Sequence, residues 1–457
     1  MLELFQNATT TFADLAWGPW LLVLLLGGGL FFLAFSGFTP FRYLPHALAL
    51  LRGRFDDKND PGHVSHFRAL SAALAGTIGM GNIAGVALAI TIGGPGAIFW
   101  MWITAIIGIA TKFFTCSLSV MYRGKDSEGV LQGGPMYVIR EAMPRQLHFL
   151  AYLFAVVGMI GCLPALQSNQ LVQIVRDLVF IDNGWLGLET DPLFINLACG
   201  AALMSLTALV ILGGLQRIAL VAAAVVPTMT LLYVGAAGVA LILNIDEVPA
   251  AFRLIFSDAF TGEAAAGGSL MGMMVYGVQR GAFSNEAGMG TESLAHGAAR
   301  TSEPIREGLV AMMGPVIDTL LICTATALMI LVSGAWLEND AVGVTLTAGA
   351  FSELLGTAGT LIIFVCVVCF ATTTIFTYAF YGTQCTSFVF GALHVQKYRF
   401  VYVGFILLAS VVSIDAAVSL IDGSFALMAI PTMISALWLA PRVKAAANDY
   451  WQRLEKK

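Results

Sequence analysis

Charged residues are scarce in this 457-residue chain: Asp, Glu, Lys and Arg make up 11% of it, against 58% hydrophobic residues. An ordinary soluble domain carries about twice that charged fraction, so this class is excluded. The mean hydropathy of +0.83 instead indicates a polytopic α-helical membrane protein, in which each span needs roughly 20 apolar residues. The formal net charge is only −5, and no basic stripe predicts a nucleic-acid partner.

The sequence also lacks a nucleotide-binding loop, a metal-ligand cluster and a plausible nucleophile–base pair. These absences argue against an ATP-driven pump and against an enzyme, so no cofactor is expected. The seven cysteines lie within or beside apolar segments and predict no disulfide framework. No Lys or Arg precedes the first apolar run, unlike in a secretory signal peptide, so that run is predicted to be a retained span.

About 11 apolar runs are long enough to cross a bilayer. They lie near residues 18–38, 66–92, 96–121, 148–178, 193–213, 218–243, 268–297, 308–333, 352–390, 400–414 and 420–440. The ninth run exceeds one bilayer thickness, which predicts a tilt or an extension beyond the membrane. No loop has room for a soluble domain, so residues 1–457 are predicted to form a single transmembrane domain.

Basic residues gather in alternate loops between these runs. All but four of the 23 Lys and Arg residues fall in the loops of one side or in the C-terminal tail; the exceptions are Lys112, Arg176, Arg253 and Arg280. The intervening loops are acidic or neutral. The positive-inside rule therefore predicts a cytoplasmic C-terminus, an N-terminus outside and an odd number of spans.

Residues 76–82, Gly-Thr-Ile-Gly-Met-Gly-Asn, lie in a run that has no charge from Ala69 to Thr111. Three glycines and an asparagine weaken a helix and free its backbone groups. At membrane depth, irregular backbone is tolerated only where it is buried in protein or lines a polar cavity. This stretch therefore predicts either an unwound binding segment, as in many secondary transporters, or a close helix–helix contact made by small residues.

Residues 277–290 form a second glycine-interrupted span, which carries Arg280, Ser284, Asn285 and Glu286. Ionisable residues at membrane depth are costly and predict function, although Arg280 and Glu286 could instead pair near an interface. About five spans separate the two interruptions, so the second half of the chain would run inverted relative to the first. Inverted repeats with discontinuous helices are typical of secondary transporters, in which half-helix N-termini bind a carboxylate and freed carbonyls bind a cation.

Further polar residues lie inside the predicted spans. Three consecutive threonines, 372–374, offer hydroxyl ligands to sodium, or they bond back to the preceding helical turn. Residues 167–170 follow Pro164 and predict a face toward the bundle interior, as substrate lining or as interhelical hydrogen bonds. Lys112 and Asp318 predict either a gate or a structural ion pair.

Four stretches closely resemble the alanine-or-glycine:cation symporter family. They are GGPGAIFWMWITAIIG at 93–108, GGPMY at 133–137, FSNEAGMG with AHGAA within 283–299, and IDTLLICTATALMILVSG at 317–334. The resemblance covers about residues 65–440. It implies sodium-coupled uptake of a small neutral amino acid by an all-α fold similar to the LeuT-type five-plus-five inverted repeat, preceded by one extra helix.

The resemblance also implies roles for parts of the chain. The expected parts are an extra N-terminal helix in 1–40, a first repeat in 65–243, a second in 266–441 and a cytoplasmic tail in 442–457. Substrate would contact Thr77, Met80, Gly81, Asn82, Gln167, Asn169, Phe283, Ser284 and Met289. Sodium would bind the carbonyls of Gly76 and Ile78 and the hydroxyls of Thr373 and Thr374. The candidates for coupling or gating are Lys112, Arg280, Glu286 and Asp318.

This chain departs from the family's common pattern near the expected substrate. Family members often read GTGN where this chain has Gly-Met-Gly-Asn at 79–82, and they often carry an acid near Thr115 and near Thr383. Met80 adds a flexible apolar side chain beside the expected pocket. Alanine or glycine is therefore the first expectation, and a somewhat larger neutral amino acid is also consistent.

These observations predict a multi-pass protein of the plasma (inner) membrane that performs sodium-coupled amino-acid symport by alternating access. The expected partners are a small neutral amino acid, sodium and the lipid bilayer. A proton-coupled or exchanging transporter of the same fold, using Glu286 or Asp318, is the alternative. A channel or a transporter-like sensor would bind such a ligand without concentrating it.

Overall fold

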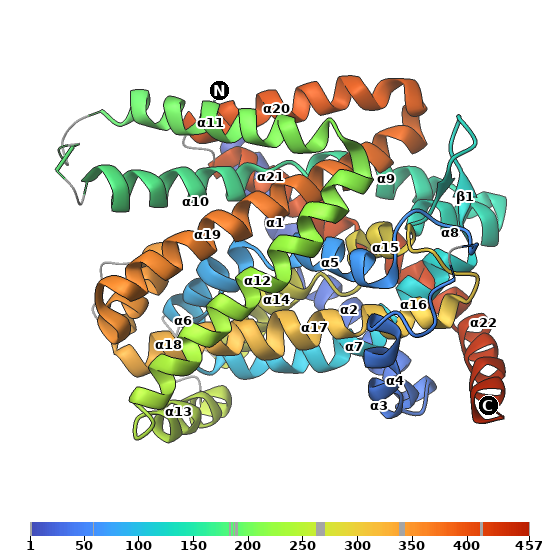
Figure 1. Cartoon of the computed structure of the whole chain (residues 1–457), viewed down its shortest axis with the longest axis horizontal. Coiled ribbons are helices and arrows are strands. Elements are labelled where there is room, and N and C mark those ends of the chain that lie inside the picture. The colour runs from blue at the N-terminus through green and yellow to red at the C-terminus, as the bar shows by residue number, and fades with distance from the viewer. Residues whose placement is uncertain are drawn as a thin grey trace.

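The computed structural model describes residues 2–57, 59–181, 184–185, 187, 191–261, 270–337, 343–411 and 415–456. Nearly all of them are helical. The small antiparallel hairpin of β1 (Gly124–Lys125) and β2 (Leu131–Gln132) lies at one end of the elongated bundle, and α13 (Val248–Thr261) lies at the other (Figure 1). We call these ends the hairpin side and the α13 side.

The helices before α13 are α1 (Leu2–Ala16), α2 (Pro19–Phe35), α3 (Thr39–Arg42), α4 (Leu44–Leu51), α5 (His66–Thr77), η1 (Gly81–Gly85), α6 (Val86–Gly93), α7 (Ala97–Met121), α8 (Pro135–Ala142), η2 (Arg145–Leu147), α9 (Phe149–Gly161), α10 (Ala165–Val175), η3 (Arg176–Ile181), α11 (Leu193–Ile211) and α12 (Gly214–Leu243). The helices after α13 are α14 (Leu270–Asn285), α15 (Thr291–His296), α16 (Pro304–Ala311), α17 (Met313–Pro315), η4 (Val316–Cys323), α18 (Thr324–Ser333), η5 (Ala335–Leu337), α19 (Val344–Phe390), η6 (Ala392–His394), α20 (Val395–Val411), α21 (Asp415–Leu427) and α22 (Ala429–Glu455).

Within the described residues, eight helices are long and apolar enough to cross a membrane, or nine if one bent pair counts as a single span. The bent pair is His66–Thr77 with Gly81–Gly93, at the first predicted interruption. The predicted spans at 268–297 and 400–414 are not among the eight, because α14 and α15 divide the first and α20 has only 17 residues. The count of about 11 stays a prediction. The predicted start of the second repeat, residue 266, lies outside the described residues.

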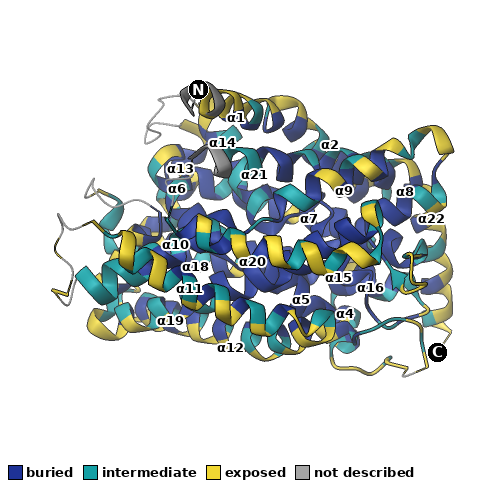
Figure 2. Cartoon of the chain, turned by 90° about the horizontal axis from the view of Figure 1, so that it is seen from above, coloured by how far each residue is buried: buried dark blue, intermediate teal, exposed yellow. Residues whose placement is uncertain are grey.

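The outward faces of the bundle are apolar. Figure 2 shows buried residues inside the bundle and exposed ones along the outer faces of helices such as α12 and α20. Leu231 and Ile242 on α12 and Phe400 on α20 are 74%, 70% and 65% exposed. Water would make such a surface costly, whereas lipid tails do not. This distribution is that of an integral membrane protein.

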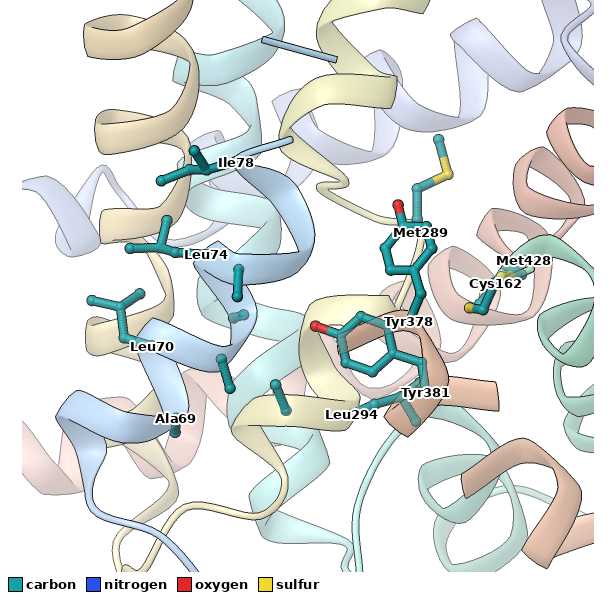
Figure 3. Packing of buried hydrophobic residues seen from close by; sticks show 14 of the residues in the cluster. Ala69, Leu70, Leu74, Ile78, Cys162, Met289, Leu294, Tyr378, Tyr381 and Met428 are labelled. Carbon is teal, nitrogen blue, oxygen red and sulfur yellow. The ribbon is translucent and has the colours of Figure 1, made fainter. Parts of the chain in front are cut away.

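The interior is organised around α5. Leu70, Leu74 and Ile78 follow one another along one face of this helix, and Tyr381 of α19 points toward it (Figure 3). Leu70 and Leu74 are four residues apart and therefore lie on the same face of a helix. Every residue from Ala69 to Thr77 is buried. The uncharged stretch from Ala69 to Thr77 thus lies inside the protein rather than against lipid.

Several of the long helical spans are broken at identifiable residues. Pro164 separates α9 from α10, as its missing N–H and fixed φ would predict. Gly356 has φ 63° and ψ −149° within α19, so this long helix is kinked in its first part. This kink lies near the start of the predicted ninth span, 352–390. The part after the kink, 357–390, is still longer than one bilayer crossing needs, so its tilt or extension beyond the membrane stays a prediction.

Candidate functional site

The first interruption lies between α5 and η1 and bends the chain by 53°. The side-chain oxygen of Asn82 accepts a hydrogen bond from the N–H of Gly79 at 2.9 Å, which satisfies one backbone group freed by the break. A Cβ on Gly79 would lie 2.5 Å from Oγ1 of Thr374, too close for any side chain. The glycine therefore serves close approach, and the asparagine stabilises the unwound backbone.

The second interruption lies between α14 and α15. Glu286 has φ 56°, the left-handed region that a side chain makes unfavourable, by about 1 kcal/mol or more. Its carboxylate accepts hydrogen bonds from Tyr378 OH at 2.6 Å and from the Thr291 hydroxyl, the first residue of α15. These contacts hold the strained residue in place. Glu286 is therefore bonded to α19 and α15, and no ion pair with Arg280 occurs among the described residues.

Asp318 connects the two interruptions. It lies on η4, a π-helical segment, and such segments often mark functional sites. Its carboxylate accepts hydrogen bonds from Asn82 Nδ2 at 2.5 Å, from Ser284 Oγ at 2.9 Å and from Thr319 Oγ1 at 2.7 Å. All four residues are at most 1% exposed. Asn82 and Ser284, predicted to contact substrate, thus turn toward Asp318.

A cavity of about 320 Å³ opens beside both interruptions. Its lining residues are Met80, Gly81, Ala84, Gly85, Leu88, Gly161, Leu163, Ala165, Leu166, Gln167, Gln170, Gln173, Arg280, Phe283, Gly343, Tyr378, Ile421, Asp422 and Phe425. The break at Pro164 brings the start of α10 to the cavity wall. This is a concave, mainly apolar site with a few polar groups, as expected for a small-molecule site.

The structure brings some of the predicted substrate residues to this cavity. Met80, Gly81, Gln167 and Phe283 line it, as does the gating candidate Arg280. The predicted residues that do not line it are Thr77, Asn82, Asn169, Ser284 and Met289. Thr77 bonds back to the carbonyl of Leu74, and the Met289 side chain is fully buried.

The predicted cation residues meet only in part. Thr374 of α19 faces the interruption at Gly79, and its hydroxyl also bonds to Phe370 O at 2.9 Å. Thr373 points elsewhere, because its hydroxyl bonds to Cys369 O and lies 3.9 Å from the sulfur of Met229. Gly76 and Ile78 lie at the end of α5, where the last carbonyls of a helix have no partner within it.

Two further hydroxyls, Thr377 Oγ1 and Tyr381 OH, are buried and have no hydrogen-bond partner in the part of the chain that the structure describes. The Thr377 and Tyr381 side chains lie beside Gly76, where an added Cβ would be 3.4 Å from the first and 3.2 Å from the second. Neither residue was among the site residues predicted from the sequence. Thr377 and Tyr381 follow Thr374 by about one and two helical turns, which places the three side chains on one face of the helix. This spacing is the sequence signal that could have predicted them.

Two residues of opposite charge line the cavity, Arg280 on α14 and Asp422 on α21, and they are near enough to each other to interact electrostatically. No ion pair within 4.0 Å joins them among the described residues, and Arg280 Nε is buried without a partner. Lys112, the other basic candidate, is 1% exposed and lies against Gly314 rather than at the cavity.

The chain matches known transporters over its whole length. A family model described as the sodium:alanine symporter family matches residues 2–457. The chain is 38% identical to the sodium/alanine symporter AgcS of Methanococcus maripaludis, over 95% of each chain. It is 33% identical to the probable sodium/glutamine symporter GlnT of Bacillus subtilis, over 98% of this chain and 91% of GlnT.

Among solved structures, MhsT in complex with L-phenylalanine resembles this chain with a TM-score of 0.61 at 14% identity. The match covers 84% of this chain and 98% of MhsT. It confirms the predicted LeuT-type fold, and the family match confirms a transporter rather than an enzyme. The chain therefore belongs to the sodium:alanine symporter family, as an integral membrane protein that couples amino-acid transport to sodium.

Proposed function

We propose that this symporter carries alanine or glycine, with the substrate held in the cavity between the two interruptions. The observation that carries the proposal is the cavity itself, which is mainly apolar, of about 320 Å³, and lined by residues of both interrupted segments. Neutral amino acids with small side chains suit such walls, because an uncharged side chain needs no charged partner in the protein. The two charged residues that line the cavity, Arg280 and Asp422, are opposite in sign and near enough to interact with each other.

The substrate carboxylate would bind at the start of η1. Met80 and Gly81 line the cavity where the helix resumes, and the first N–H groups of a helix are free donors at its positive end. Phe283 lies opposite, close to Gly81, where an added Cβ would be 3.7 Å from its ring. Met80 narrows the apolar part of the pocket and sets how large a side chain fits.

Sodium would bind beside the substrate, with the freed carbonyls of Gly76 and Ile78 and the hydroxyl of Thr374 as ligands. Hard cations prefer oxygen ligands of this kind. The hydroxyl of Thr377, which has no hydrogen-bond partner among the described residues, belongs to a side chain beside Gly76 and supports the same location. We assign Thr373 a packing role against α12, because its side chain faces Met229.

The chain would form two inverted repeats, residues 65–243 and 266–441, with the hairpin side in the cytoplasm. The basic loops and tail support this orientation through the positive-inside rule. Arg280 and Asp422 would then close the outer side when substrate is bound. Sodium and amino acid would stabilise the same closed state, so each raises the affinity for the other by the same factor.

A panel of uptake measurements in proteoliposomes tests the proposal. Alanine and glycine should accumulate only with an inward sodium gradient, and larger neutral amino acids should compete less well. Uptake that ignores sodium would refute coupling, and uptake driven by a proton gradient instead would favour the proton-coupled alternative.

The paired threonines refine the test. Thr374→Ala removes a proposed ligand and should raise the half-saturating sodium concentration by about fivefold or more, as for the loss of about 1 kcal/mol. Thr373→Ala is the matched control, since its hydroxyl faces away, and should leave sodium dependence nearly unchanged. The opposite ranking would move the cation site to Thr373.

A further inference from the structure

Three titratable side chains form a cluster on the hairpin side, away from the cavity. The Glu307 carboxylate on α16 contacts His66 Nδ1 through Oε2, and its Oε1 lies 2.5 Å from His296 Nδ1. All three side chains are at most 1% exposed. Because an ionised carboxylate only accepts hydrogen bonds, both imidazoles donate through Nδ1.

The cluster fastens both interrupted helices to one carboxylate. His66 is the first residue of α5, and His296 is the last residue of α15. These two helices are the hairpin-side halves of the interrupted spans. Backbone hydrogen bonds run alongside, from the N–H of Arg300 to Val64 O at 2.6 Å and from the N–H of His63 to Ala298 O at 2.8 Å.

We propose that His66, His296 and Glu307 form a proton-sensitive lock that keeps the hairpin side closed. The inference rests on the proposed function, since a symporter working by alternating access must open this side to release its cargo. Separating α5 from α15 and α16 breaks at least one imidazole–carboxylate contact. The lock is thus a barrier that each transport cycle has to cross.

A proton strengthens the lock for a geometric reason. With both imidazoles neutral, the cluster holds one buried negative charge, which is unfavourable. One added proton makes the cluster neutral. His66 Nε2 can take up this proton, because the atom is buried, has no hydrogen-bond partner among the described residues and lies 3.9 Å from Oδ1 of Asp56. Protonated His66 would bridge Glu307 and Asp56.

Other ionisable groups surround the cluster on every side. Arg306 and Asp56 lie near His66, Arg123 and Cys116 lie near Glu307, and Glu292 lies near His296. One step further out, Asp60 lies near Arg123 and Lys112 lies near Glu292. Three of these groups are cationic and three are anionic, so to first order they offset one another and the charge of the cluster itself decides how a proton acts.

The direction of the pH effect follows by linkage. The closed lock binds the proton more tightly than separated, hydrated imidazoles do, so acid favours the closed state. This stabilisation is present at low pH and is lost as pH rises. One linked proton changes the opening equilibrium by at most about tenfold per pH unit.

Hydrogen–deuterium exchange tests the lock without using transport. The full chain in lipid nanodiscs, free of substrate, is compared at pH 6 and pH 8, with the intrinsic pH dependence of amide exchange corrected. We expect residues 61–77 and 291–311 to exchange several-fold more slowly at pH 6. Equal corrected exchange at the two pH values in the wild-type protein would overturn the proposal.

Asparagine variants separate protonation from structure. His66→Asn combined with His296→Asn keeps an amide donor near each Nδ1 position and removes both titrating rings, so the pH difference should vanish while the side stays closed. His148→Asn is the control, because that ring contacts Met143 O at 3.2 Å outside the cluster. Glu307→Gln should also abolish the difference, and if this variant does not fold the histidine variants decide.

The outcomes also separate the lock from the proposed function. Sodium-independent uptake with an intact pH difference in exchange would refute the proposed function and leave the lock standing. Sodium-driven alanine uptake with a wild-type pH difference in the His66→Asn, His296→Asn variant would refute the lock alone.

Discussion

The two sides of the protein differ in how their charged groups are paired. On the hairpin side, Arg123 donates hydrogen bonds to four backbone carbonyls, and the lock joins α5 to α15 and α16. At the cavity, Arg280 and Asp422 have opposite charges. Among the described residues, however, no ion pair with an N–O distance within 4.0 Å joins them. Under the proposed alternating-access function, we expect such an asymmetry in a state that is open away from the hairpin side.

Breaking the fastened side should have the largest effect. Arg123 bonds to the carbonyls of Pro61 and Thr301, both at 3.1 Å, to Gly297 O at 2.7 Å and to Ala299 O. Burial lowers the pKa of Arg123 to about 10, which leaves it protonated at neutral pH. Arg123→Gln should destabilise the closed hairpin side by about 3 kcal/mol, on the order of a hundredfold in the opening equilibrium.

Exchange of residues 61–77 and sodium-driven accumulation of alanine measure this change. In the Arg123→Gln variant, amide exchange of residues 61–77 should be much faster and sodium-driven alanine accumulation should be lost. Arg140→Gln is the control on the same side. Arg140 pairs with the neighbouring Glu141 at 2.9 Å and bonds to Lys125 O at 3.1 Å, and neither of these residues lies on α5 or α15. If Arg123→Gln behaves like Arg140→Gln, the hairpin side is held by other contacts.

Preventing the cavity side from closing should have an intermediate effect. Asp422→Asn keeps the size of the side chain but removes the charge that attracts Arg280. Closure would lose about 1 kcal/mol, so uptake should fall about fivefold. Asp246→Asn, an exposed position in the turn between α12 and α13, is the control.

A charge exchange sharpens this test. Arg280→Asp combined with Asp422→Arg restores an attraction, and uptake should recover in part relative to either single change. Failure to recover, with both single variants inactive, would assign Arg280 and Asp422 separate roles in the cavity.

The interruptions could be predicted from the sequence because their signals are local. Gly76, Gly79 and Gly81 weaken the helix within seven residues, and the glycines at 288 and 290 take positive φ where α14 ends. Charges in a span such as Arg280 also point to function by themselves. The family resemblance then supplied the fold.

Side-chain direction could not be predicted in the same way. Thr373 and Thr374 are adjacent in the sequence, yet only Thr374 faces the first interruption, because successive helical residues point about 100° apart. The lock pairs His66 with Glu307 over 241 positions, a separation at which no local pattern exists. Asp422 likewise reaches the cavity from a distant helix.

The smallest expected effect concerns the contribution of the N-terminal helices to the open side. Trp17 lies between α1 and α2, and its ring centroid is 6.4 Å from that of Phe283 at the cavity. Its indole Nε1 is buried near the Asp422 carboxylate and makes no hydrogen bond among the described residues. Trp17→Phe keeps the aromatic contact but removes this donor. Because only one weak polar contact is lost, uptake should change by about twofold.

The same substitution in an Asp422→Asn background should have no further effect, since the charge near the indole is gone. An equal twofold loss in both backgrounds would mean that Trp17 acts through packing against Phe283, and the open side would then depend on Arg280 and Asp422 alone.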